Sequence, residues 1–144
     1  MSNHSAAIKQ LLTELSRDVK GYQQLSAKLK QQHQLLANRD SRTLPALNDE
    51  LNALMGDLYR HAQQRTQVLE KMGLSPDDSG MQRLFKALPA TLGQQGQQLW
   101  QQLFQLTQEC QELNNQNGRL LARHKQMIDK LLKPEQQYCY GPGI

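Results

Sequence analysis

Histidine is the side chain in this sequence best suited to acid–base catalysis or zinc binding, and it occurs four times. His33, His61 and His124 each fall within a repeating leucine pattern, whereas His4 lies near the N-terminus. No two histidines have the spacing of metal ligands on one helical face, and the HExxH motif is absent. We therefore interpret the three as partly buried, hydrogen-bonded helix residues, and we expect no metal and no cofactor.

The carboxylates and thiols give equally little support for catalysis. Asp49 and Glu50 stand near a predicted helix start, where negative charge favours the helix dipole, and Asp77 and Asp78 lie in a predicted turn. A catalytic carboxylate pair needs a shaped apolar pocket, which a thin helical bundle rarely provides. The two cysteines lack metal-type spacing, and glycine-rich phosphate loops and activated serine motifs are absent. These patterns predict that the protein is not an enzyme.

Charge and hydropathy limit the other classes of partner. The formal net charge is only +4, whereas a nucleic-acid interface needs a denser basic stripe with interleaved aromatics. The N-terminal residues have no apolar core of signal-peptide length. No stretch approaches the roughly 20 apolar residues that cross a bilayer. We expect a cytoplasmic protein with no nucleic-acid partner and no membrane insertion.

The positions of the leucines predict the elements that carry these residues. Mostly apolar positions recur at steps of three and four in the ranges 5–38, 44–72 and 90–133, as in coiled-coil seams, and the steps alternate apart from one four-four step in the second range. A short helix over 80–88 precedes Pro89, and Gly73 and Pro134 are helix stops. The sequence predicts an all-α fold, an elongated antiparallel helical bundle or coiled coil of three long helices plus a short one. Residues 1–134 would form one domain, and residues 135–144 a flexible tail.

The last predicted helix has features of a binding element. A helix over 90–133 would be about 65 Å long at ~1.5 Å per residue, longer than either earlier helix. It should therefore overhang the hairpin of the first two. Beyond Leu113 its apolar stripe is wider than one seam and comprises Leu120, Leu121, Met127, Ile128, Leu131 and Leu132. Such an uncovered stripe marks a partner site, unless it buries itself or a second copy covers it in a homodimer.

The same helix carries a family resemblance. Residues 113–121 read LNxxNGxLL, followed by Lys133-Pro134 and Tyr140-Gly141. This signature resembles the C-terminal part of FlgN-type flagellar export chaperones. Residues 36–40 are similar to the end of that family's first helix, and residues 65–73 to the close of its second. The interval from Leu121 to Pro134 is shorter than in familiar members, and little follows Gly141.

The resemblance implies a bacterial type III export chaperone. Such proteins hold unassembled hook-associated junction proteins by their C-terminal helices and deliver them to the flagellar export gate protein. The substrate-binding residues expected from the stripe and the signature are Leu113, Asn114, Asn117, Gly118, Leu120, Leu121, Met127, Ile128, Leu131 and Leu132. Tyr140 matches the family's tail tyrosine, which implies contact with the gate. The alternative is a generic coiled-coil adaptor or homo-oligomeric scaffold with no secretion role.

Two signature residues have physical properties of their own. Asn117 occupies a seam position, where a buried amide fixes the register of packed helices at some cost in stability. Gly118 weakens a helix by about 1 kcal/mol relative to alanine. Together they predict a point where the helix bends or where a partner approaches closely.

Overall fold

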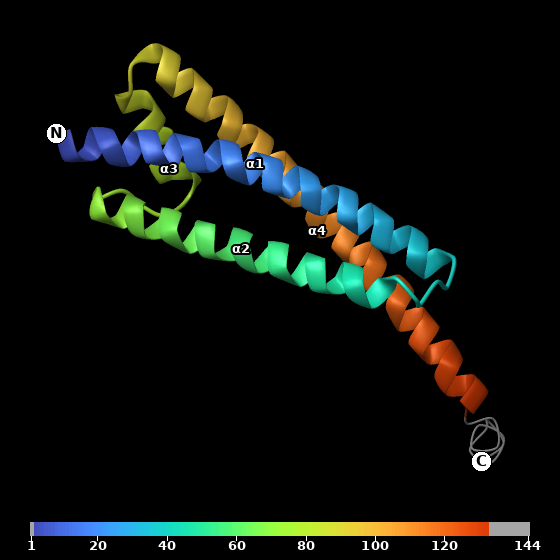
Figure 1. The fold of residues 1–144 in the computed structure, drawn as a ribbon. Helices are drawn as coiled ribbons and strands as arrows, with labels where there is room; N and C mark the ends of the chain where they lie inside the picture. The colour runs from blue at the N-terminus through green and yellow to red at the C-terminus, as the bar shows by residue number, and fades with distance from the viewer. Residues whose placement is uncertain (1, 133–144) are drawn as a thin grey trace.

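The computed structural model describes residues 2–132, which form four helices and no strand (Figure 1). These are α1 (Ser2–Ala37), α2 (Leu44–Lys71), α3 (Asp78–Ala87) and α4 (Ala90–Leu132). The all-α fold class predicted from the sequence is confirmed. The predicted tail over 135–144 lies outside the described residues. No helix in the described range is long and apolar enough to cross a membrane.

Two helices begin earlier than the sequence pattern placed them. Helix α1 starts at Ser2 rather than near residue 5, since no glycine or proline interrupts its first residues. Helix α3 starts at Asp78 because the Asp77 carboxylate accepts a hydrogen bond from the Gly80 backbone N–H at 3.1 Å. This N-cap turns residues expected to form loop into the first helical turn. The same hydrogen bond lowers the pKa of Asp77.

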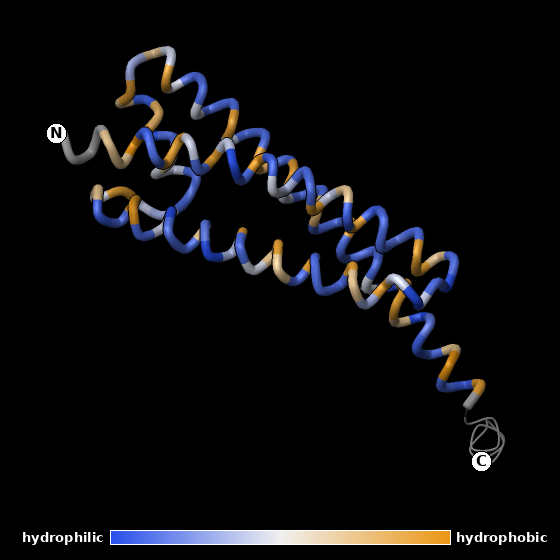
Figure 2. The backbone as a smooth tube through the Cα atoms, in the orientation of Figure 1, coloured by the Kyte–Doolittle hydropathy of each residue, from blue (hydrophilic) through white to orange (hydrophobic). Residues whose placement is uncertain are grey.

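Helix α1 is the centre of the arrangement. Helix α4 packs mainly on α1 and α3, and α2 packs mainly on α1. Helix α2 runs antiparallel to α1, whereas α4 runs parallel to it, as Figure 1 shows. The C-terminal part of α4 extends past the turn that joins α1 to α2 (Figure 1). The colouring by hydropathy in Figure 2 shows apolar residues along the packed faces and also on this extension.

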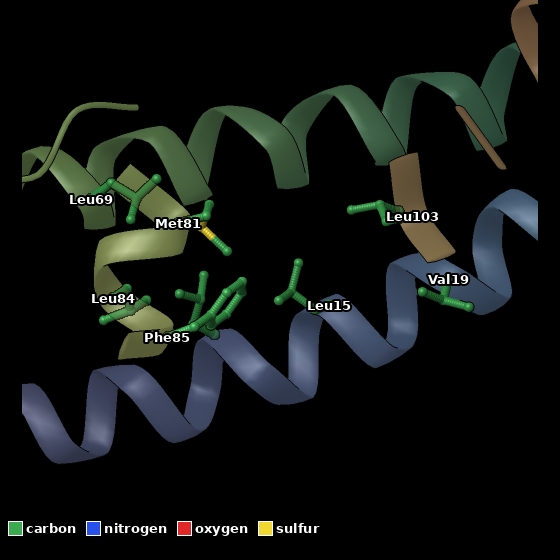
Figure 3. Close-up of a cluster of buried hydrophobic side chains, with 8 residues drawn as sticks. Leu15, Val19, Leu69, Met81, Leu84, Phe85 and Leu103 are labelled. Carbon is green, nitrogen blue, oxygen red and sulfur yellow. The ribbon is translucent and has the colours of Figure 1, made fainter. Parts of the chain in front are cut away.

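One apolar cluster lies at the end of the bundle that holds α3 (Figure 3). Its buried members are Leu11, Leu15, Val19, Leu69, Met81, Leu84, Phe85 and Leu103. Helix α3 can approach α4 closely because α4 has a glycine at the contact. A Cβ atom on Gly96 would lie 2.5 Å from Cε1 of Phe85. The aromatic ring therefore fills the space where a side chain would otherwise stand.

A second apolar cluster holds the three long helices together nearer the α1–α2 turn. Its buried members are Leu25, Leu29, Leu47, Leu51, Leu58 and Cys110. Full burial of one leucine stabilises a fold by roughly 1.5–3 kcal/mol. The leucine seams predicted from the sequence thus form the packed faces of the bundle.

A polar chain links all four helices beside the first cluster. Asp18 of α1 is 1% exposed, and its carboxylate accepts hydrogen bonds from His61 Nδ1 at 2.7 Å and Arg65 at 3.0 Å. The Arg65 guanidinium lies 5.7 Å from the centre of the Trp100 ring, and Trp100 Nε1 donates to Asp78 at 2.7 Å. A buried carboxylate is tolerated when it is paired in this way. His61 therefore has a structural partner rather than an open catalytic position.

Candidate functional site

Helix α4 is fastened to α1 at the point where it begins to leave the bundle. Asn117 is 3% exposed, and its Nδ2 donates to the Leu29 carbonyl at 2.8 Å and to Gln32 Oε1 at 2.9 Å. Its Oδ1 lies 2.9 Å from His33 Nδ1. Because an amide oxygen only accepts, this hydrogen bond requires His33 to carry its proton on Nδ1. Asn117 thus fixes the register between α1 and α4, as its seam position predicts.

Beyond Asn117 a groove opens between α4 and the α1–α2 turn, and we call it the apical groove. Its volume is about 350 Å³. Its lining is Leu35, Leu36, Arg39, Asp40, Ser41, Leu44, Leu121, His124, Met127, Ile128 and Leu131. Most of these side chains are apolar, and they come from both walls. The groove is therefore a concave apolar surface at one end of the molecule.

The wall formed by α4 is the more exposed one. Exposed fractions are 55% for Leu121, 53% for Ile128 and 72% for Leu131. These three residues, with Met127, repeat at helical spacing, so they form one continuous row along the helix. Isolated exposed leucines are common on proteins, but a row that lines a groove is typical of a partner site.

The other wall depends on how α1 ends. Arg39 has a φ of 54°, a left-handed conformation that is uncommon for a residue other than glycine. The Asp40 backbone N–H donates to the Leu35 carbonyl at 2.8 Å, which closes the turn. The reversed chain carries Arg39 towards α4, where its guanidinium donates to Met127 Sδ at 3.2 Å. This contact bridges the two walls of the apical groove.

The predicted binding residues fall into separate groups. Leu121, Met127, Ile128 and Leu131 line the apical groove, and Leu120 is half-buried on the same helix. Leu113 packs against the second apolar cluster, and Asn117 is engaged with α1. Leu132 is the last residue of α4. Tyr140 lies outside the described residues.

The remaining signature residues, Asn114 and Gly118, lie elsewhere. Asn114 lines a second groove, of about 300 Å³, together with Met55 and Tyr59 of α2. A Cβ atom on Gly118 would meet nothing within 4 Å. Among the described residues, no packing contact therefore requires a glycine at this position, and α4 continues as helix through it.

Several groove residues were not foreseen from the sequence. Leu36 and Leu44 fall within the predicted helices 5–38 and 44–72, and the sequence pattern gives neither them nor Arg39 a role in binding. The sequence offers one signal, which is that leucines stand close to both ends of the α1–α2 connection. Their convergence with the end of α4 depends on the position of the turn in space.

Among the side chains that the structure describes, the three histidines have separate surroundings. His33 contacts Asn117 and His61 contacts Asp18, while His124 lines the apical groove. Within residues 2–132 no group of three or more histidine, cysteine, aspartate and glutamate side chains is placed to hold a metal ion. Burial raises the pKa of the Cys110 thiol to about 11, helped by the negative charge of Glu109. That thiol is therefore held in its unreactive, protonated form at neutral pH.

Within residues 2–132 the protein is an open helical bundle of three long helices and one short helix, with a row of exposed apolar side chains at one end. The family model described as FlgN protein matches residues 1–138. The chain therefore belongs to the FlgN family. It is similar to the crystal structure of a flagella synthesis protein, FlgN, from Pseudomonas aeruginosa, with 27% sequence identity and a TM-score of 0.73. That match covers 78% of this chain and 86% of the other. The comparison with curated proteins finds no match.

Proposed function

We propose that this protein is a cytoplasmic flagellar export chaperone that binds unassembled hook-associated junction proteins through the apical groove. Membership of the FlgN family supports a flagellar export chaperone role in general terms. The observation that carries the finer proposal is the exposed apolar row of α4 above the groove. An amphipathic helix laid along that row would cover it, which is a recurring mode of peptide recognition.

The chemistry of the groove suits reversible holding. Its exposed side chains are about half buried in the free protein, so only the remaining half can be covered by a partner. Covering each one therefore contributes on the order of 1 kcal/mol to the free energy of binding. Part of that gain is offset by the cost of ordering the partner. A chaperone must release its substrate for export, and binding of this modest strength permits release.

The ten predicted residues take different roles in this proposal. The substrate helix contacts Leu121, Met127, Ile128 and Leu131, and we propose that Leu120 and Leu132 add to this contact. Asn117 and Leu113 hold α4 on the bundle and thereby position the row, since their partners lie within the chain. Gly118 has no side chain and Asn114 has a short polar one, so the adjoining surface of α4 projects little and is polar.

The test is direct binding of the C-terminal peptide of a hook-associated junction protein to the purified chain. We expect binding at micromolar peptide concentration, abolished by Ile128→Ser combined with Leu131→Ser. The control is Phe104→Ser, because Phe104 is 60% exposed on the same helix but does not line the groove. Absence of binding by the folded wild-type chain would disprove the proposal. Equal loss in the control would disprove the assignment of the groove.

Delivery to the export gate is proposed for Tyr140, which follows the bundle in sequence. If the tail serves delivery alone, a chain that stops after Pro134 keeps its affinity for the substrate peptide while export of the substrate falls. Loss of both together would contradict this division. The alternative function, an adaptor or homo-oligomeric scaffold with no secretion role, predicts self-association and no change in export.

A further inference from the structure

Basic side chains gather around one edge of the apical groove. The Arg39 guanidinium donates to Met127 Sδ at 3.2 Å. Arg123 and Lys130 stand four residues before and three residues after Met127. Residues at these spacings are neighbours on a helix surface. Arg39 thus contacts a methionine that lines the groove, and Arg123 and Lys130 lie on the same flank of α4 as that methionine.

Little negative charge balances this cluster. Among the described residues, neither Arg123 nor Lys130 lies within ion-pair distance of a carboxylate. Asp40 lines the groove, so one carboxylate offsets part of the positive charge of these three cations. Asp129 is two residues from Met127 and so projects from the other side of α4. An anionic occupant would relieve the repulsion among these cations.

We propose that the helix bound in the apical groove carries carboxylates along the flank that faces Arg39, Arg123 and Lys130. This inference rests on the proposed function and adds the chemical character of the partner segment. The apolar face of that helix covers the leucine and isoleucine row of α4. Its acidic flank meets the cations at the Met127 edge and sets the direction and register in which it lies.

Two other occupants match this charge pattern poorly. A second copy of the chain, packed groove to groove, would bring identical cations together, and like charges facing each other across an interface are costly. The chain's own residues 133–144 contain one lysine and one glutamate, so their side chains offer no net negative charge. A partner helix with an acidic flank fits the observed surface better than either.

The experiment uses three designed amphipathic peptides with the same apolar face. Their flanking positions are all glutamate, all glutamine or all lysine, and their affinities for the full chain are measured by fluorescence anisotropy. At low salt we expect the glutamate peptide to bind about tenfold more tightly than the lysine peptide, as two or three exposed ion pairs would give. The preference should shrink as salt is raised, because exposed charges are screened. Combining Arg123→Glu with Lys130→Glu should invert it.

The matched control is the single reversal Lys125→Glu, compared with the single reversal Arg123→Glu. Lys125 is exposed like Arg123, but it neighbours Leu121 and Ile128 on the opposite edge of the row. Only Arg123→Glu should reduce the preference, and circular dichroism should show both variants folded. Equal effects of the two reversals would overturn the inference.

The remaining outcomes separate this inference from the proposed function. Equal binding of all three peptides would overturn the charge inference alone and leave a groove that recognises apolar faces. No binding of any peptide would overturn both. A dimer in light scattering that Leu131→Ser converts to a monomer would overturn the inference by making a second copy the occupant.

Discussion

Asn117 is the residue whose hydrogen bonds hold the binding element in place. Both donors and the acceptor of its amide are used within the chain, across two helices. A seam leucine at this position would pack without fixing a register. The amide therefore fixes one position of α4 against one turn of α1. The direction of the part of α4 that follows Asn117 depends on this connection.

Asn117→Ala should lower the free energy of unfolding by about 1–3 kcal/mol, because it removes the hydrogen bonds of a buried amide to the Leu29 carbonyl, Gln32 and His33. Urea denaturation measures the change. Asn115→Ala is the matched control, since Asn115 is exposed on the neighbouring surface of the same helix and should change stability by less than about 0.5 kcal/mol. Equal effects would mean that the amide network contributes nothing.

Cys110 makes a second prediction at the scale of a residue. The residue is 4% exposed, and the raised pKa of about 11 of its thiol leaves almost no thiolate near pH 8. In a Cys139→Ser background, alkylation by iodoacetamide at pH 8 should be slow in the native chain and fast in urea. Fast labelling of the native protein would contradict the packing of the second cluster.

The same pKa sets a pH window for stability. The folded-state pKa of about 11 lies above the ordinary value of 9.0, so the folded state keeps its proton longer than the unfolded state. The stabilisation is complete below pH 9 and is lost as the pH rises towards 11. Wild type should therefore lose more stability over this window than Cys110→Ala, which removes the titrating group.

At the scale of the element, the glycines of α4 serve different ends. Gly96 gives Phe85 room to pack, whereas Gly118 faces open space. Substitution by alanine should therefore change the stability of the protein in opposite directions at the two sites. Gly118→Ala should stabilise the protein by up to about 1 kcal/mol, since alanine is the better helix former. Gly96→Ala should destabilise it by about 1–3 kcal/mol, because the aromatic ring must move.

Thermal unfolding of the two variants tests this pair. Stabilisation by both would show that α3 yields to a new methyl group without loss of packing. Peptide binding by Gly118→Ala then reports on function. If the partner approaches α4 closely at this position, the variant will be more stable than wild type and bind more weakly.

At the scale of the whole molecule, the free energy of local opening should decrease along α4 from its N-terminal to its C-terminal end. Its first part packs on α1 and α3, whereas the segment 120–132 forms one wall of the apical groove and contacts the rest of the chain there. Few buried contacts mean a low free energy of local opening. Amide hydrogen exchange should be faster in 120–132 than in 97–117.

Addition of the substrate peptide should slow exchange in 120–132 more than elsewhere. The reason is that a covered apolar row and paired flanking charges both disfavour opening of the helix. Protection spread evenly over the bundle would contradict docking at the apical groove. Protection confined to the second groove, around Met55 and Tyr59, would move the site there.

The fold class could be read from the sequence because its determinants are local. Leucine periodicity, good helix formers and a few stops such as Gly73 set the helices, and Gly73 does adopt a φ of 73° after α2. The overhang of α4 also followed from relative lengths. The family signature was recognisable because it is a contiguous run of residues.

Only the tertiary structure decided which signature residues face the bundle and which face the groove. Asn117 and Leu121 are four residues apart on one helix, yet the first is buried and the second is 55% exposed. The difference arises because α1 ends beside this part of α4, and a helix pattern contains no information about where its neighbour stops. Arg39 reaches Met127 for the same reason, across 88 residues of sequence. Contacts of that kind depend on the relative rotation and register of packed helices, which no single segment specifies.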